Sequence, residues 1–199
     1  MSHFTDANDP LALFQIWFED ASGSEINDPD AMTLATIGEN NLPDARMVLC
    51  KGSDARGLTF YTNSESAKGR ELAANPMAAA LFHWKSLRRQ VRFRGAVSQI
   101  TSEESNAYFA SRPRLSRIGA WASQQSRSLG SRAALEAAVR HYEERFAASD
   151  IPRPPYWGGY RLAPIEIEFW QDGEARLHDR IRFTRPTTNS PWVKQRLFP

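Results

Sequence analysis

Four ionisable side chains occupy every second position of the segment RLHDRIR near the C-terminus. Alternate side chains of an extended strand point to the same face. The spacing therefore predicts a basic row made of Arg176, His178, Arg180 and Arg182. Neighbouring cations repel one another, so such a row is tolerated when it is solvated, paired with acids or crossed by an anionic ligand. The segment alone leaves these three explanations open.

The segment RQVRFR predicts a second polar face on a strand. Gln90, Arg92 and Arg94 would share one side of that strand, while the two apolar residues between them point into the core. An exposed strand face explains this pattern as well as an anion-binding surface does.

Two further segments have the residue types that bind a phosphate group. Tyr108 and Arg112 are four residues apart and would lie on the same side of a helix, with Ser116 further on beyond a proline. A tyrosine packed on an arginine for structural reasons is the equally common alternative. In YTNSESAKGR a strand runs into a helix start, where free amides and Lys68 could bind an anion.

Several kinds of catalytic site are missing from the sequence. It contains no nucleophile elbow, no glycine-rich phosphate loop and no HExxH zinc helix. The four histidines are spread without ligand spacing, and Cys50 is the single cysteine, so we expect neither a metal site nor an intrachain disulfide. Separate anion-binding groups and many aromatic residues instead favour a phosphorylated ligand with a flat ring.

The elements that would position these residues are short strands with helices inserted between them. A helix is expected over about 9–22, because Asp9 can cap it and Phe14 and Trp17 recur at helical spacing. Further helices are expected over 66–74 and within an insert of about 102–148. The expected strands cover 31–37, 44–51, 57–63, 77–84, 89–100, 159–171, 176–185 and 191–198. Without a βαβα alternation, this order predicts a mainly β fold with inserted helices (α+β), an antiparallel barrel in one domain of residues 1–199.

The composition is that of an ordinary globular protein. Hydrophobic residues make up 41% and charged residues 24% of the 199 residues, and the net charge of +2 does not give the field of a nucleic-acid-binding protein. The longest apolar run, 77–82, is too short to cross a membrane, and the first ten residues lack the pattern of a signal peptide. We expect a soluble, cytoplasmic protein with neither a nucleic-acid nor a membrane partner.

Long strings of the sequence resemble the pyridoxine (pyridoxamine) 5′-phosphate oxidase family. The strings are RMVLCK at 46–51, FYTN at 60–63, RRQVRFRG at 88–95, YFASRPRLSRIGAWASQQS at 108–126, YWGGYRL at 156–162 and IEFWQDGEARLHDR at 167–180. The resemblance extends from about Asp9 to Pro199. It implies an FMN-binding split barrel that works as a homodimer with the flavin at the interface.

The resemblance also implies roles for individual residues. The flavin contacts would be Arg46, Met47, Lys51, Tyr61, Thr62, Lys68, Gln90, Gln125, Ser126, Trp170 and Arg180. The substrate contacts would be Lys51, Tyr108, Arg112, Ser116, Arg176 and His178. Arg176 and His178 would lie closest to the reacting carbon and act in catalysis. FMN and the substrate each bring a phosphate, which would explain two separate basic clusters.

The implied reaction is the oxidation of pyridoxamine or pyridoxine 5′-phosphate to pyridoxal 5′-phosphate, with O2 as electron acceptor and H2O2 as product. Two features depart from the family pattern. Ala67 stands where many members have an arginine, which predicts weaker FMN binding, and only eight residues precede Asp9 where members often have a longer basic arm.

Three other functions remain open at this point. Another flavin split-barrel reductase would share the flavin contacts but not the set Tyr108, Arg112 and Ser116. A non-catalytic FMN or pyridoxal phosphate binding protein would bind its ligand without consuming oxygen. A nucleic-acid-binding protein would use Lys85, Arg88, Arg89, Arg92 and Arg94.

Overall fold

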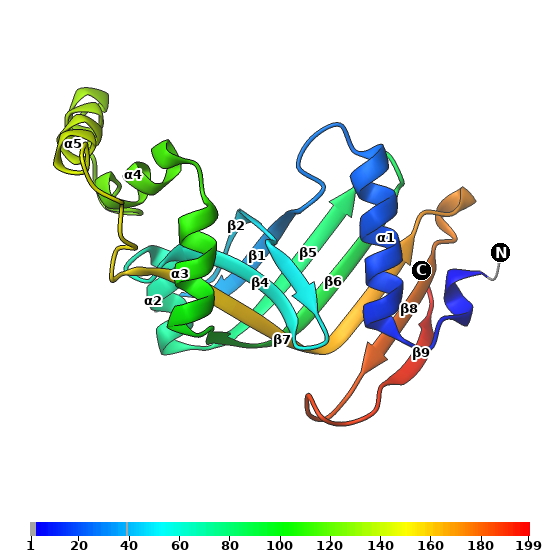
Figure 1. The fold of residues 1–199 in the computed structure, drawn as a ribbon. Helices are drawn as coiled ribbons and strands as arrows, with labels where there is room; N and C mark the ends of the chain where they lie inside the picture. The colour runs from blue at the N-terminus through cyan, green and yellow to red at the C-terminus, as the bar shows by residue number, and fades with distance from the viewer. Residues whose placement is uncertain (1–2, 39) are drawn as a thin grey trace.

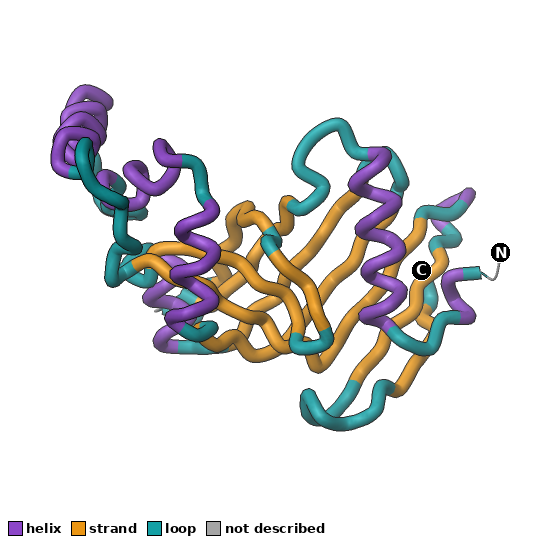
Figure 2. Tube along the Cα trace, viewed as in Figure 1, coloured by secondary structure: helices purple, strands orange, loops and turns teal. Residues whose placement is uncertain are grey.

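The computed structural model describes residues 3–38 and 40–199 as a curled antiparallel sheet with helices against its faces and at one end (Figures 1 and 2). Residue 39, inside the turn expected between the first two strands, lies outside the described residues, as do residues 1 and 2. The strands are β1 (Ala31–Ile37), β2 (Pro43–Leu49), β3 (Gly52–Asp54), β4 (Gly57–Asn63), β5 (Met77–Trp84), β6 (Arg89–Gln99), β7 (Trp157–Gln171), β8 (Asp179–Thr184) and β9 (Val193–Leu197). The helices are α1 (Pro10–Ser24), α2 (Ala67–Ala74), α3 (Ser102–Ser111), α4 (Arg114–Ala122) and α5 (Arg132–Arg145), with short 3-10 turns η1 (Phe4–Asp6) and η2 (Glu174–Arg176).

Strand β7 organises the sheet because it contacts different neighbours along its two halves. The strand order is β2-β1-β5-β6-β7-β4-β3, with β8 also on β7 and β9 on β8, and the pairings of the described residues are antiparallel. Residues 157–162 of β7 pair with β4, and residues 166–171 pair with β8. The antiparallel fold class is therefore confirmed.

Aromatic side chains from α1 and the sheet make the main core. Asp9 caps α1 by accepting bonds from the amides of residues 11 and 12, as expected. Phe14 then packs on Phe93, with 4.9 Å between ring centroids, and Trp17 packs edge-on against Phe169 at 5.2 Å. These contacts bury the apolar face of the helix against one face of the sheet.

A second, smaller core lies where the inserted helices meet the start of β7. Its buried members are Phe109, Ile118, Phe146, Ile151 and Trp157. Helix α5 has no buried residue of its own and lies at the outer end of the molecule (Figure 1). The insert expected over about 102–148 thus consists of α3, α4 and α5, which stand at one end of the sheet.

The prediction of a four-residue basic row at 176–182 is wrong. Residues 172–178 form a wide loop, in which Ala175 and Arg176 have φ angles of 52° and 62°, and β8 begins only at Asp179. The amide of residue 177 donates to the carbonyl of Glu174 inside this loop, so strand alternation does not reach Arg176 or His178. Only Arg180 and Arg182 alternate on the strand as expected.

The helix expected to carry both Tyr108 and Arg112 ends before the arginine. Helix α3 stops at Ser111, and Arg112 has extended backbone angles of φ −74° and ψ 147°. The cause is Pro113, because a residue that precedes proline is disfavoured in the helical region. The short strand β3 was not expected either, because its residues Gly52, Ser53 and Asp54 are of types typical of turns.

Candidate functional site

The turn from β4 into α2 buries a lysine next to polar side chains. Ser66 caps α2 by accepting a bond from the amide of Gly69, which sets the direction of the first helical turn. Lys68 is 7% exposed, and its Nζ lies 3.4 Å from Thr62 Oγ1. Thr62 Oγ1 in turn donates to Gln125 Oε1 at 3.1 Å. Three of the predicted flavin contacts therefore lie together.

Lys68 differs from Arg46, the neighbouring predicted contact, in having no acidic partner. Arg46 Nη2 lies 2.5 Å from Asp44 Oδ2 and 3.0 Å from Glu71 Oε2, and its hydrogen bond holds the pKa of Asp44 below the ordinary value. No carboxylate of a described residue forms an ion pair with Lys68. Burial, and then the charge of Arg46, lower the pKa of Lys68. Lys68 is thus a cation whose charge an incoming anion would stabilise.

A hollow of about 390 Å³ is lined by Thr62, the residue that contacts Lys68, and by two of the predicted substrate contacts. Its walls include Thr62, Arg112, Ser116, Gln125 and Trp157. The Arg112 guanidinium carbon lies 4.9 Å from the centre of the Trp157 ring, and its Nη1 is buried without a hydrogen-bond partner among the described residues. Burial lowers the pKa of Arg112. A buried guanidinium nitrogen without an acceptor is what an anionic ligand would satisfy.

Tyr108 lies on the neighbouring side of the same aromatic stack. Its ring lies 3.9 Å from that of Tyr61, which stacks on Trp157 at 5.2 Å. Tyr108 faces a second hollow together with Lys51, whose Nζ is bound to Asp30 Oδ2 at 2.6 Å. Burial is the largest single influence and opposes the charge on Lys51, but the hydrogen bond and charge of Asp30, with smaller contributions from Tyr108 and Asp28, together raise the lysine pKa. Tyr108 and Arg112 therefore meet through stacked rings rather than along one helix face.

Two predicted flavin contacts have exposed positions. Met47, on β2, is 62% exposed, and its sulfur accepts a bond from Thr33 Oγ1. Ser126 lies in the loop after α4 with a φ angle of 70°. Neither Met47 nor Ser126 is surrounded by buried polar groups of the described chain.

The remaining predicted contacts lie at the other end of the sheet. The strand register places Gln90, Trp170 and Arg180 directly opposite one another on β6, β7 and β8. The loop after β7 brings the His178 ring to 4.6 Å from that of Trp170, and both residues line a hollow with Arg176. His178 Nδ1 lies 3.2 Å from Asp172 Oδ1 and accepts a bond from the amide of Gly173.

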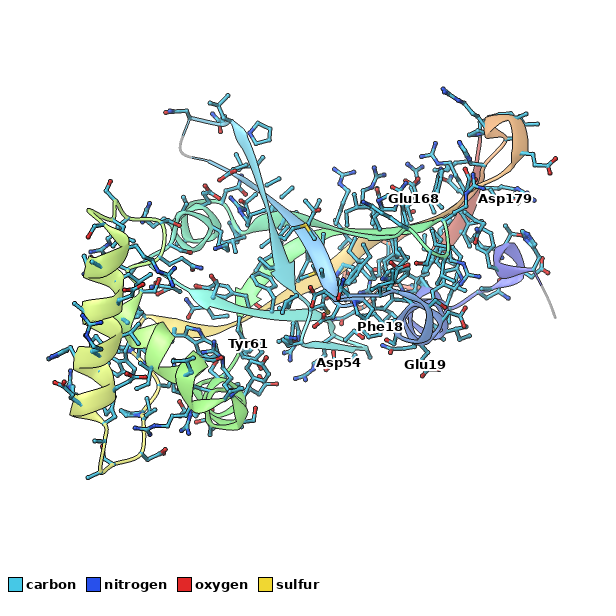
Figure 3. All side chains as sticks on the ribbon, turned by 90° about the horizontal axis from the view of Figure 1, so that it is seen from above. Phe18, Glu19, Asp54, Tyr61, Glu168 and Asp179 are labelled. Carbon is cyan, nitrogen blue, oxygen red and sulfur yellow. The ribbon has the colours of Figure 1, made fainter. Side chains whose placement is uncertain are left out.

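The two groups of predicted contacts lie near opposite ends of β7. Trp157 borders the first group and Trp170 belongs to the second, and the length of strand that joins them is roughly 40 Å along the backbone at ~3.3 Å per residue. Figure 3 shows the same separation, with Tyr61 at one side of the molecule and Glu168 and Asp179 at the other. One chain does not bring both groups to a single small ligand.

The basic residues of the nucleic-acid alternative are largely neutralised. Ion pairs join Arg88 to Asp172, Arg89 to Asp20, Arg92 to Glu168 and Arg94 to Glu166. Such pairing weakens the positive field that this alternative requires. The sequence did not reveal these carboxylates as partners, because each lies far along the chain from the arginine that it pairs with.

Comparisons with known proteins cover nearly the whole chain. Residues 18–146 match the family described as pyridoxamine 5′-phosphate oxidase, and residues 157–199 match the pyridoxine 5′-phosphate oxidase C-terminal dimerisation region, which supports a homodimer. The chain is 61% identical to a pyridoxine/pyridoxamine 5′-phosphate oxidase of Azorhizobium caulinodans, over 98% of this chain and 92% of that protein. It is 58% identical to the enzyme of that name from Agrobacterium fabrum, over 100% and 96% of the two chains.

Two solved structures have the same fold. PhzG from Burkholderia lata, in complex with tetrahydrophenazine-1-carboxylic acid, superposes with a TM-score of 0.92 at 31% identity, over 100% of this chain and 98% of the other. A pyridoxamine 5′-phosphate oxidase-related, FMN binding protein from Nostoc punctiforme gives a TM-score of 0.75 at 19% identity, over 100% of both chains. Residues 3–38 and 40–199 contain no cluster of three or more potential metal ligands and no helix able to span a membrane.

Proposed function

The chain belongs to the pyridoxamine 5′-phosphate oxidase family, and from this premise we propose that it oxidises pyridoxamine or pyridoxine 5′-phosphate to pyridoxal 5′-phosphate. With the alcohol substrate, one O2 is reduced to one H2O2 for each aldehyde formed. With the amine substrate, water is consumed in addition and ammonia is released. The proposed site lies between two copies of the chain.

The observation that carries this proposal is the presence of two cations, buried Lys68 and half-buried Arg112, that form no ion pair with a carboxylate of the described residues. Lys68 has no acidic partner in the described chain, and Arg112 Nη1 has no hydrogen-bond partner there. Arg112 lines the hollow itself, whereas Lys68 contacts one of the lining residues, Thr62. A flavin phosphate and a substrate phosphate would each satisfy one of them.

The residues at the first group fit FMN. Lys68 lies in the first turn of α2, where free backbone amides also favour a phosphate. Arg46, Met47, Lys51, Tyr61, Thr62, Gln125 and Ser126 would surround the rest of the cofactor, and Gln90, Trp170 and Arg180 of a second copy would close over it. Bound FMN supplies the hydride acceptor, which O2 then reoxidises.

The chain's own residues would bind and orient the substrate. Arg112 and Ser116 would hold its phosphate in the hollow beside Trp157, with Tyr108 and Lys51 at the neighbouring wall. Arg176 and His178 of the second copy would approach the ring and exclude water from the reacting carbon. Fixing the phosphate at one end orients the carbon at the other, which lowers the entropic part of the barrier.

Oxygen uptake by the purified dimer tests this function. With FMN and pyridoxine 5′-phosphate, we expect oxygen to be consumed in a one-to-one ratio with the aldehyde formed, followed by absorbance. The flavin spectrum of the purified protein reports the cofactor independently. A protein that cannot be loaded with FMN, or that binds it without consuming oxygen, would contradict the proposal.

A further inference from the structure

Glu168 is a nearly buried carboxylate on the same sheet face as the row formed by Gln90, Trp170 and Arg180. It lies on β7, two residues before Trp170, and its side chain is 7% exposed. Burial of a carboxylate is costly unless cations and hydrogen bonds compensate for the lost water. The residues that compensate here come from the two strands on either side of β7.

Each oxygen of Glu168 binds a different arginine. Oε1 accepts bonds from Arg180 Nε at 2.9 Å and from Arg180 Nη2 at 2.5 Å. Oε2 accepts a bond from Arg92 Nη2 at 2.5 Å. The carboxylate therefore joins β6 to β8 across β7, on the face that carries the proposed flavin contacts.

The third nitrogen of the Arg180 guanidinium is also fixed. Arg180 Nη1 donates to the carbonyl of Phe198 at 3.0 Å, so all three nitrogens of this side chain have a bond within the described chain. An arginine otherwise samples many rotamers, and holding it in one orientation lowers the entropy lost when a ligand binds. Two of the three anchoring bonds come from Glu168.

We propose that Glu168 is a positioning residue that holds the Arg180 guanidinium in its flavin-binding orientation. This inference rests on the proposed function, because it assumes that Arg180 contacts FMN. Without the carboxylate, the charges of Arg92 and Arg180 would repel each other and Arg180 would lose both the Nε and the Nη2 bond. Glu168 thus determines where Arg180 points without touching the ligand.

Glu166 provides a matched control on the same strand and the same face. Its oxygens lie 3.4 Å from Arg94 Nη1 and 3.5 Å from Arg92 Nη2, which are weaker contacts than those of Glu168. The register places Glu166 opposite Thr184, one row further from Arg180 than Glu168 is. Replacing Glu166 removes an acid from this face while leaving Arg180 bound.

The experiment measures the FMN dissociation constant of the dimeric apoprotein by quenching of flavin fluorescence. We expect Glu168→Gln to raise this constant by about tenfold or more, as loss of a supporting partner does in metal sites. Glu166→Gln should change the FMN dissociation constant by less than about twofold, which is the size of the deviations seen when two sites act independently. Thermal unfolding of each apoprotein separates lost binding from lost folding.

A double-mutant cycle shows whether Glu168 acts through Arg180. Arg180→Lys keeps the charge but cannot form the two-nitrogen contact, so it should weaken FMN binding as Glu168→Gln does. If Glu168 acts only through Arg180, the double variant should bind FMN no more weakly than the Arg180→Lys variant does. If Glu168→Gln fails to fold, Glu168→Asp, which keeps the charge but withdraws the carboxylate from Arg180, takes its place in the cycle with the same expected loss of FMN affinity.

Three results would overturn the inference. They are equal FMN affinity of the Glu168→Gln and Glu166→Gln proteins, full additivity in the cycle, and unchanged affinity of Arg180→Lys. A wild-type protein that does not bind FMN at all would instead contradict the proposed function.

Discussion

The burial of Lys68 favours the binding of an anionic ligand but lowers the stability of the folded apoprotein. Its pKa is lowered, which means that the protonated form is less stable in the folded chain than in the unfolded chain. We expect Lys68→Met to raise the Tm of the apoprotein by about 2–4 °C, the shift that ~1 kcal/mol gives in a chain of this size. The same change should weaken FMN by about 10- to 150-fold, because a charge-assisted contact is lost. Lys85→Met, at an exposed turn, should alter neither quantity.

The pH dependence of that stability difference follows from the direction of the shift. Because the folded pKa lies below the ordinary value of 10.5, the unfolded chain binds this proton more tightly. The unfolding free energy of the wild type therefore rises with pH between the folded pKa and the unfolded pKa. The Tm advantage of Lys68→Met should be largest near about pH 7 and shrink toward about pH 10. A difference that grows with pH would contradict the burial of a charged lysine.

Arg112 and Arg176 are expected to affect catalysis in different ways. Arg112→Ala removes a charge-assisted contact of roughly 1.5–3 kcal/mol from the substrate phosphate, which raises KM by about 10- to 150-fold with little change in kcat. Arg176→Ala should lower kcat as well, since a residue beside the reacting carbon positions the transition state. Oxygen uptake with pyridoxine 5′-phosphate measures both, and flavin absorbance confirms the cofactor content. If Arg112→Ala loses flavin or leaves KM unchanged, Arg112 does not bind the substrate phosphate.

Individual site residues differ in how far the sequence could predict their surroundings. The environment of Lys68 could be anticipated, because a strand end and a helix start lie next to it in sequence. The partners of Arg180 could not be, since Glu168 is 12 residues away and meets it only through the pairing of β7 with β8. The sequence did contain one indication that these glutamates share a strand face. In IEIEFW the two glutamates alternate with Ile167 and Phe169, which are buried.

At the scale of elements, a single glycine determines how closely β6 approaches β7. The register of this pair shifts between Arg94 and Gly95, and a Cβ atom at Gly95 would lie 2.0 Å from the Ala163 carbonyl oxygen. Gly95→Ala should therefore separate the strands and destabilise the protein by about 3 kcal/mol, a Tm decrease of about 6–12 °C. Gly23→Ala, at an exposed position of α1, meets nothing within 4 Å and should be neutral or slightly stabilising. Equal Tm values for the two variants would show that β6 can move away without cost.

The sequence predicted regular elements well and irregular connections poorly. Strands β1, β4 and β5 match their expected bounds, because alternating or continuous apolar runs end at clear turn residues. A connection was expected at 172–175, but the loop extends to residue 178 and the strand begins only at Asp179. The residues with left-handed backbone angles are Ala175 and Arg176, whereas the sequence would suggest a glycine at such positions. The hydrogen bond from the amide of Leu177 to the carbonyl of Glu174 forms only once the loop has folded. The alternation of residue types predicts a strand from residue 176, but the left-handed backbone at residues 175 and 176 delays the start of the strand to Asp179.

At the scale of the whole molecule, the separation of the two groups of contacts along β7 has a direct consequence. If each proposed site takes Arg112 from one copy and Arg176 from the other, no chain can build a site alone. The dimerisation region at 157–199 includes Arg176 and β8, which would place that half of each site at the subunit contact. Dissociation of the dimer should therefore abolish activity even where each chain stays folded.

Mixing two impaired variants tests this arrangement. Arg112→Ala and Arg176→Ala chains, unfolded together and refolded at equal concentration, would form mixed dimers in about half of all cases. Each mixed dimer would contain one site with both arginines intact and one with neither. We expect oxygen uptake, measured well below the substrate KM, to recover to about a quarter of the wild-type value. Refolding each variant separately is the control, and it should give no recovery. If the mixture is no more active than the separate variants, both arginines act within one chain, and the proposed shared site is wrong.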